Sequence, residues 1–193
     1  MANTTRDRII TTTAGLLRRQ GYAGTGLKQI AKDSDTAFGS LYHFFPDGKE
    51  QLAAETLRWA GRGYQLLVEA VLGNAPDVVS GAADVFTGAA EVLRQTDYAD
   101  ACPIETVALE VASSNEALRQ VTAEVFEGWA QAGTTYFVSA GIAAATARDL
   151  SLTLIGALEG AFVLCRAMKS TEPMEAAGRA VTVAVRRALE ATP

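Results

Sequence analysis

Histidine and cysteine are scarce in this 193-residue sequence, and their scarcity excludes several kinds of site. The single histidine, His43, cannot build a histidine-rich metal centre. Cys102 and Cys165 lie far apart, so they form neither a disulfide framework nor a Cys-x-x-Cys metal or redox pair, which fits a reducing cytoplasm. We therefore expect no metal, no cofactor and a cytoplasmic location.

Motifs that carry a known catalytic mechanism are also missing. The sequence contains no His-Glu-x-x-His, Gly-x-Ser-x-Gly, P-loop or Gly-x-Gly-x-x-Gly phrase. Neither cysteine has a histidine near it in the sequence, and Glu105 and Glu110 have a spacing that does not bring them close together on one helix face. We therefore expect no catalytic residues and predict that the chain is not an enzyme.

Long apolar runs are absent as well. Residues 1–21 contain none that could form the apolar core of a secretion signal, so we expect no export. The most apolar stretch spans residues 150–165. Ser151, Thr153 and Glu159 interrupt it, and it is shorter than the roughly 20 apolar residues that a membrane span needs. We interpret it as a buried helix of a soluble protein that has no membrane partner.

The sequence does have enough apolar residues for a core, and its charge is unevenly distributed. Hydrophobic residues make up 49% of the chain, so disorder is not expected. Residues 1–63 carry nine Lys or Arg against six Asp or Glu, a net charge of +3, whereas residues 64–193 carry eight against sixteen, a net charge of −8. A basic N-terminal part followed by an acidic remainder suits an anionic polymer that touches only one end of the chain.

Nearly every segment has apolar residues at helical spacing, and no run alternates over the length of a strand, so we expect an all-α fold. The expected helices are residues 5–20, 27–32, 37–44, 49–72, 78–95, 104–113, 116 through at least 129, 143–169 and 173–191. Thr25 and Thr36 are placed to cap the second and third of these helices. Leu41 and Phe45 are expected to point inward from the third.

The first three expected helices form a helix-turn-helix arrangement. The second and third are short, a turn at residues 33–36 joins them, and the longer first helix braces both. Polar side chains stand where such a unit would meet phosphates and base edges if its third helix entered a major groove. These are Lys28, Thr36, Ser40, Tyr42, His43 and Lys49. The same arrangement is also a common way to pack helices in a bundle.

Several short phrases occur in a fixed order between Ile9 and Leu57. They are Gly21-Tyr22, Thr25, Ile30-Ala31, GSLYHFF at residues 39–45 and KEQL at residues 49–52. In order and spacing this stretch resembles the N-terminal DNA-binding domain of the TetR family of transcriptional regulators. Further motifs are similar to sequences of the LmrA/YxaF-like subgroup of that family. They are FPDGKEQL, ACPIETVALE, and ALEGAFVL followed by STEP. The resemblance implies a helix-turn-helix DNA-binding domain at residues 1–48 and a helical ligand-binding and dimerisation domain at residues 49–193.

The resemblance also implies roles for individual residues of the first domain. Thr25, Lys28, Tyr42, His43 and Lys49 would contact backbone phosphates, and Thr36, Ala37, Phe38 and Ser40 would face bases. Three positions depart from the family pattern: Asp35 replaces a turn glycine, Ala37 replaces a frequent polar residue, and Phe38 stands where Lys or Arg is common. Phe38 either packs on a thymine methyl group or folds back onto the protein. Because Asp33 and Asp35 adjoin it, non-specific attraction to phosphate is weak and base readout matters more.

The second domain is expected to dimerise and to bind a ligand, as the bodies of this family do. The apolar face of residues 150–165, with Gly156 and Gly160 allowing close approach, suits an interface in which the last two helices pair with their copies. The candidate ligand-lining residues are Phe86, Tyr98, Cys102, Phe126, Trp129 and Phe162. Any one of them can instead be plain core, and Cys102, next to Pro103, is alternatively a redox sensor.

We therefore predict a homodimeric, ligand-responsive transcriptional regulator. It would act as a repressor that binds a near-palindromic double-stranded DNA operator through two recognition helices about 34–36 Å apart. A small hydrophobic effector would release it. Two alternatives remain: an activator or corepressor-dependent regulator, and a helical ligand-binding or interaction protein whose N-terminal unit has lost DNA binding.

Overall fold

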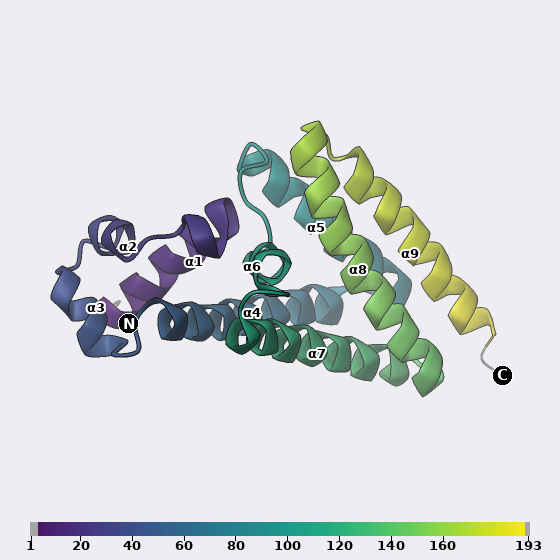
Figure 1. Ribbon diagram of the computed structural model, residues 1–193. Coiled ribbons are helices and arrows are strands. Elements are labelled where there is room, and N and C mark those ends of the chain that lie inside the picture. The colour runs from purple at the N-terminus through teal and green to yellow at the C-terminus, as the bar shows by residue number, and fades with distance from the viewer. Residues whose placement is uncertain (1–3, 192–193) are drawn as a thin grey trace. The chain divides into compact units, whose positions relative to one another are not determined.

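In the computed structural model, which describes residues 4–191, the chain folds into nine α-helices and no strand (Figure 1). The predicted all-α fold is confirmed. The helices are α1 (Thr5–Gly24), α2 (Leu27–Asp33), α3 (Phe38–Phe44), α4 (Lys49–Asn74), α5 (Val78–Gln95), α6 (Pro103–Val111), α7 (Glu116–Ser139), α8 (Ala144–Met168) and α9 (Glu172–Glu190).

The contacts within the chain divide these helices into two compact units. The first unit comprises the residues up to Gly63 together with Ala101–Val125, and the second comprises Tyr64–Asp100 together with the residues from Phe126 onward. Helices α4 and α7 each contribute to both units. The domain division predicted between residues 48 and 49 stays a prediction.

The core of the first unit holds the two short helices in place. A capping box starts α1, because the Thr4 hydroxyl accepts from the Asp7 N–H at 3.2 Å and the Asp7 carboxylate accepts from the Thr4 N–H at 3.1 Å. The apolar face of α1 then packs with residues of α2, α3 and α4. The buried members of this cluster are Ile9, Ile10, Ile30, Ala31, Leu41, Phe45 and Leu52. The predicted inward positions of Leu41 and Phe45 are confirmed, since they are 2% and 1% exposed.

The predicted caps of the two short helices are wrong. Gly26 is the N-cap of α2 and Ala37 is the N-cap of α3, and neither helix start has a side-chain cap. The Thr25 hydroxyl donates instead to the Gly21 carbonyl at 2.6 Å, and the Thr36 hydroxyl donates to the Ser34 carbonyl at 3.1 Å. In each case the N-cap is the residue after the predicted threonine. Each threonine hydroxyl therefore donates to a carbonyl that precedes it in the chain.

The second unit is built around α5, α8 and α9. Helices α8 and α9 run side by side and both pack against α5 (Figure 1). Their shared core includes Phe86 of α5, Cys165 of α8 and Met174 of α9, which are 2%, 0% and 0% exposed. Helices α5 and α9 approach each other closely at Gly178, where an added Cβ would lie 2.9 Å from the Phe86 Cβ.

Helix α8 has two apolar faces, and only one of them is buried. Ala147, Leu150, Leu154, Ala161 and Cys165 are buried in the second unit. Leu152, Val163, Leu164 and Met168 are exposed. Within residues 4–191, α8 is the one helix that is long and apolar enough to cross a membrane by length and composition. The predicted burial of this helix is therefore confirmed for one face, and its other face is open.

Substitution of Gly178 by Ala should destabilise the second unit, because the new methyl group would meet the Phe86 side chain in a packed core. We expect a decrease of about 1–3 kcal/mol in the free energy of unfolding. Urea unfolding at one fixed protein concentration measures it.

The matched control is Gly88→Ala on α5, where an added Cβ meets no heavy atom within 4 Å. That change should stabilise by about 0.5–1 kcal/mol, since alanine favours a helix more than glycine does. Equal effects of the two substitutions would contradict the close approach of α5 and α9.

Candidate nucleic-acid interface

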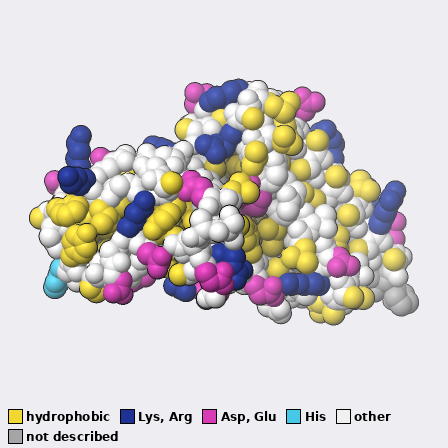
Figure 2. Space-filling view, viewed as in Figure 1, with side chains coloured by type: hydrophobic (Ala, Val, Ile, Leu, Met, Phe, Trp, Pro, Cys, Tyr) yellow, Lys and Arg dark blue, Asp and Glu magenta, His cyan; other side chains and the backbone are white. Residues whose placement is uncertain are grey.

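The outward face of α3 is apolar and aromatic. Leu41 and Phe45 are buried, whereas Phe38 and Tyr42, which form a neighbouring i,i+4 stripe on this seven-residue helix, are 44% and 49% exposed. The two rings meet edge to face, with centroids 5.7 Å apart and an interplanar angle of 71°. Figure 2 shows hydrophobic side chains at the surface in the region of α3, beside the histidine in cyan. Phe38 therefore lies on the surface and does not fold back into the core.

The other residues predicted to face bases surround this aromatic pair. Ala37, the N-cap of α3, is exposed, whereas Ser40 is half-buried. Thr36 is half-buried as well, and its hydroxyl is occupied by the Ser34 carbonyl. The structure brings all four predicted base-facing residues to the start of α3.

The residues predicted to contact phosphates are less uniformly placed. Lys28, Tyr42 and His43 are exposed, and the His43 ring lies edge-on to Phe44 with centroids 5.0 Å apart. Thr25 differs from them because its side chain is 1% exposed. With its hydroxyl donated to the Gly21 carbonyl, Thr25 is a structural residue of the α1–α2 connection.

Lys49, at the first position of α4, lies over an aromatic ring. Its ammonium nitrogen is 4.2 Å from the centroid of the Tyr22 ring, a cation–π contact. Burial lowers the pKa of Lys49, and the nearby Glu110 carboxylate opposes this effect. Burial also raises the pKa of Tyr22, with a further contribution from Glu50. The Lys49 ammonium group is therefore partly buried and already interacts with the Tyr22 ring and the Glu110 carboxylate.

Helix α6 is joined to the end of α1 by the Glu110 carboxylate. One oxygen accepts from the Ala23 N–H at 2.9 Å. The other fills the space beside Gly21, where an added Cβ would lie 1.7 Å from it. Gly21 has φ 71° and ψ −175°, a conformation that essentially only glycine adopts. The sequence signalled the helix break at Gly21, but nothing in it indicated that a residue so distant in the chain would pack there.

The first unit is electrically neutral as a whole. Arg119 is the only basic residue of Ala101–Val125, which also carries Glu105, Glu110, Glu116 and Glu124. Added to the N-terminal residues, they bring the unit to ten basic and ten acidic side chains. Several cations are also paired within the unit, as in the Arg6–Glu55 and Arg58–Glu124 ion pairs. Attraction to phosphate therefore depends on where the charges lie and not on an excess of them.

The six predicted ligand-lining residues lie in three different parts of the structure. Phe86, Tyr98 and Phe162 belong to the core of the second unit. Phe126 and Trp129 meet edge to face with centroids 5.5 Å apart, and Trp129 also lies 6.5 Å from the ring of Tyr64. Cys102 belongs to the first unit and is 6% exposed, a burial that does not favour redox sensing. Tyr64, the third ring of this aromatic cluster, is not among the predicted ligand-lining residues.

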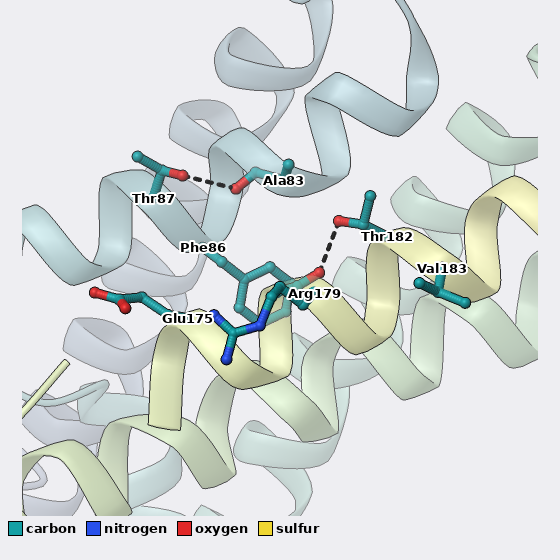
Figure 3. A pocket seen from close by; sticks show the side chains of 8 residues that line it. Ala83, Phe86, Thr87, Glu175, Arg179, Thr182 and Val183 are labelled. Atoms are coloured by element: carbon teal, nitrogen blue, oxygen red, sulfur yellow. Dashed lines mark hydrogen bonds between the residues drawn. The ribbon is translucent and has the colours of Figure 1, made fainter. Parts of the chain in front are cut away.

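An open groove of about 510 Å³ runs between α5 and α9 in the second unit (Figure 3). It is lined by Ala83, Phe86, Thr87, Glu175, Gly178, Arg179, Thr182 and Val183. Of the six predicted ligand-lining residues, Phe86 alone borders it. The Thr87 and Thr182 hydroxyls in this groove donate to carbonyls of their own helices, those of Ala83 and Gly178.

Two family models match separate parts of the chain. Residues 9–56 match the model of bacterial regulatory proteins of the tetR family. Residues 79–180 match the model of the C-terminal domain of LmrA/YxaF-like transcriptional regulators. These ranges cover all the motifs that carried the predicted resemblance, which is confirmed.

Individual relatives match over nearly the whole chain. The HTH-type transcriptional regulator YxaF of Bacillus subtilis (strain 168) is 31% identical over 182 residues, which cover 94% of this chain and 95% of that protein. The HTH-type transcriptional regulator LmrA of the same organism is 28% identical over 169 residues, covering 88% and 90%. A solved TetR transcriptional regulator from Chloroflexus aurantiacus J-10-FL has a TM-score of 0.78 at 26% identity, covering 95% of this chain and 94% of that one.

Substitution of Gly21 by Ala should destabilise the first unit. Alanine is strained at this backbone conformation by about 1–3 kcal/mol, and its methyl group would displace the Glu110 carboxylate from the Ala23 N–H. Urea unfolding measures the decrease in stability. In a Glu110→Ala background, which removes both the collision and the hydrogen bond to the Ala23 N–H, Gly21→Ala should cost only the backbone strain.

Gly15→Ala on α1 is the control, because an added Cβ there meets no heavy atom within 4 Å. It should be neutral or stabilising by up to about 1 kcal/mol. A Gly21→Ala protein as stable as the Gly15→Ala protein would refute the contact between α6 and the end of α1.

Proposed function

This chain belongs to the TetR family of DNA-binding transcriptional regulators, with a C-terminal domain of the LmrA/YxaF-like type, and we propose that it is a homodimeric repressor released from its operator by a small hydrophobic effector. The family consists of regulators, so the prediction that the chain is not an enzyme is confirmed. The observation that supports the proposed operator contact best is the exposed face of α3, held outward by the buried Leu41 and Phe45.

DNA contact through α3 follows from the geometry of the first unit. A helix enters the major groove only if its outer face protrudes and its inner face is anchored. Phe38 and Tyr42 are exposed, while Leu41 and Phe45 anchor the helix in the core of the first unit. Lys28, in the first turn of α2, and His43, in the last turn of α3, are exposed and are the proposed contacts to backbone phosphates.

Dimerisation through α8 and α9 is supported by their open apolar faces. Leu152, Val163, Leu164 and Met168 of α8 and Val183 of α9 are each between 45% and 57% exposed. Burying such a face against its copy removes apolar surface from water, a favourable contribution of about 25 cal/mol per Å² that offsets the lost freedom of the two chains. A two-fold pairing of α8 and α9 would form a four-helix interface.

The proposed effector site is the aromatic cluster of Tyr64, Phe126 and Trp129 in the second unit. These three side chains are half-buried, and their rings meet edge to face. Half-buried aromatic rings that are already held by one another suit a planar apolar ligand. Helix α4, 26 residues long, starts beside the DNA-binding face at Lys49 and contributes Tyr64 to this cluster, which makes it the proposed route of coupling.

The function is tested with the full-length chain and labelled duplexes from the region upstream of its own coding sequence. We expect sequence-selective binding that weakens as salt rises, and the dye 8-anilinonaphthalene-1-sulfonate, an aromatic probe that carries one sulfonate group, should weaken it about 5- to 150-fold. Fluorescence anisotropy measures both. Strengthened binding would instead indicate a corepressor, and the absence of selective binding at every salt concentration would sink the repressor proposal.

Lys28→Ala provides the charge-specific comparison within the same assay. It should lower the slope of log affinity against log salt by about 0.9 for each phosphate that the lysine neutralises, with little change in sequence preference. Arg62→Ala on α4 removes an equal charge at another exposed site and should leave the slope unchanged.

Dimerisation is tested by Leu164→Glu on α8. The leucine is 53% exposed in the single chain, so its replacement should leave folding intact while placing a charge in the proposed interface. We expect sedimentation analysis at micromolar concentration to change from dimer to monomer. The matched control is Val92→Glu on α5, at a position 45% exposed, which should stay dimeric. A dimeric Leu164→Glu protein would place the interface elsewhere.

A further inference from the structure

The exposed part of α3 lacks the side chains that read guanine or adenine by paired hydrogen bonds. Arg or Lys binds guanine in this way and Asn or Gln binds adenine, each through two atoms of one base edge. Residues 36–43 contain none of these four residue types. The Thr36, Ser40 and Tyr42 hydroxyls and the His43 imidazole remain, but a single hydrogen bond from any of them suits more than one base, and the Thr36 hydroxyl already donates to the Ser34 carbonyl.

Charge near α3 does not compensate for this lack. Asp33 and Asp35 immediately precede the helix and are exposed, while Lys32 is the nearest basic residue in the chain before it. The first unit as a whole is neutral, with ten basic and ten acidic side chains. Neither paired hydrogen bonds nor a net positive charge therefore accounts for affinity for one sequence over another, and a contact of another kind is needed to add to it.

The remaining distinctive group is the Phe38 ring. It is 44% exposed at the first position of α3, and the edge contact with Tyr42, with ring centroids 5.7 Å apart, favours one orientation of the ring before DNA binds. A ring that is already ordered gives up little conformational freedom on binding. In the major groove, the apolar group that a base pair presents is the C5 methyl of thymine.

We propose that Phe38 is a specificity-determining residue that packs against thymine C5 methyl groups, so that each operator half-site carries thymine where α3 meets the groove. The inference rests on the proposed function, because it requires α3 to enter the major groove of an operator. The exposed surface of α3 would then select A·T pairs through the thymine methyl group and not through the hydrogen-bonding edge of the bases.

The test starts from duplexes selected by the full-length chain out of a random-sequence library. In the selected duplex, each thymine is replaced in turn by deoxyuridine, symmetrically in both half-sites. This change preserves base pairing and removes only the methyl group. We expect one position at which the replacement weakens binding about fourfold per half-site and about 15-fold in both, the factors that correspond to about 0.8 kcal/mol for each buried methyl.

Two variants connect this weakening to Phe38. Phe38→Ala should bind the thymine and deoxyuridine duplexes within a factor of about two of each other, because the partner of the methyl group is gone. Tyr42→Phe keeps the ring that holds Phe38 in place and removes only a hydroxyl. It should weaken binding to both duplexes alike and keep the full discrimination between them.

The outcomes separate the inference from the function on which it rests. A library that yields no enriched sequence would overturn the proposed function and the inference with it. An enriched sequence with no position sensitive to deoxyuridine, or a folded Phe38→Ala protein that still discriminates, would overturn the role of Phe38 and leave the regulator intact. Urea unfolding of Phe38→Ala provides the check on folding, and an exposed position should leave stability nearly unchanged.

Discussion

The packing of Leu41 and Phe45 against α1, α2 and α4 is the interaction on which the DNA-binding surface depends. Helix α3 has only seven residues and no side-chain cap, so it is too short to be stable alone. Burial of these two side chains with Ile9, Ile30 and Leu52 keeps it folded and sets its rotation. Because that rotation turns Phe38 and Tyr42 outward, the chemistry offered to DNA follows from the core beneath it.

A second set of contacts within the same unit involves α6. The Glu110 carboxylate accepts from the backbone at Ala23 and fills the space beside Gly21, while Lys49 and Tyr22 pack nearby through a cation–π contact. The end of α1, the start of α4 and α6 therefore share one polar cluster. Any shift of α6 would alter contacts next to Lys49, one of the residues proposed to meet DNA, which gives the proposed release of the operator a structural starting point.

The two faces of α8 show why apolar composition alone describes this chain poorly. The helix is apolar enough to cross a membrane by length and composition, yet Cys165 and its buried neighbours pack in the second unit while Leu164 and Met168 are exposed. Both faces are apolar because each has its own partner, the core for one and, as proposed, a second copy for the other. Periodicity cannot distinguish these partners, since both select the same residue types.

The sequence by itself determined the helical class, the approximate helix positions, the family and the inward positions of Leu41 and Phe45, because helical periodicity and short motifs are local properties. It misplaced the caps at Thr25 and Thr36, since one residue of register changes which hydroxyl faces a helix start. Only the tertiary structure decided that Glu110 packs at Gly21, that Tyr64 joins Trp129, and that Phe38 rests on Tyr42 at the surface. The first two contacts join residues far apart in the chain, and the exposure of Phe38 depends on the core that sets the rotation of α3, so no local pattern could encode them.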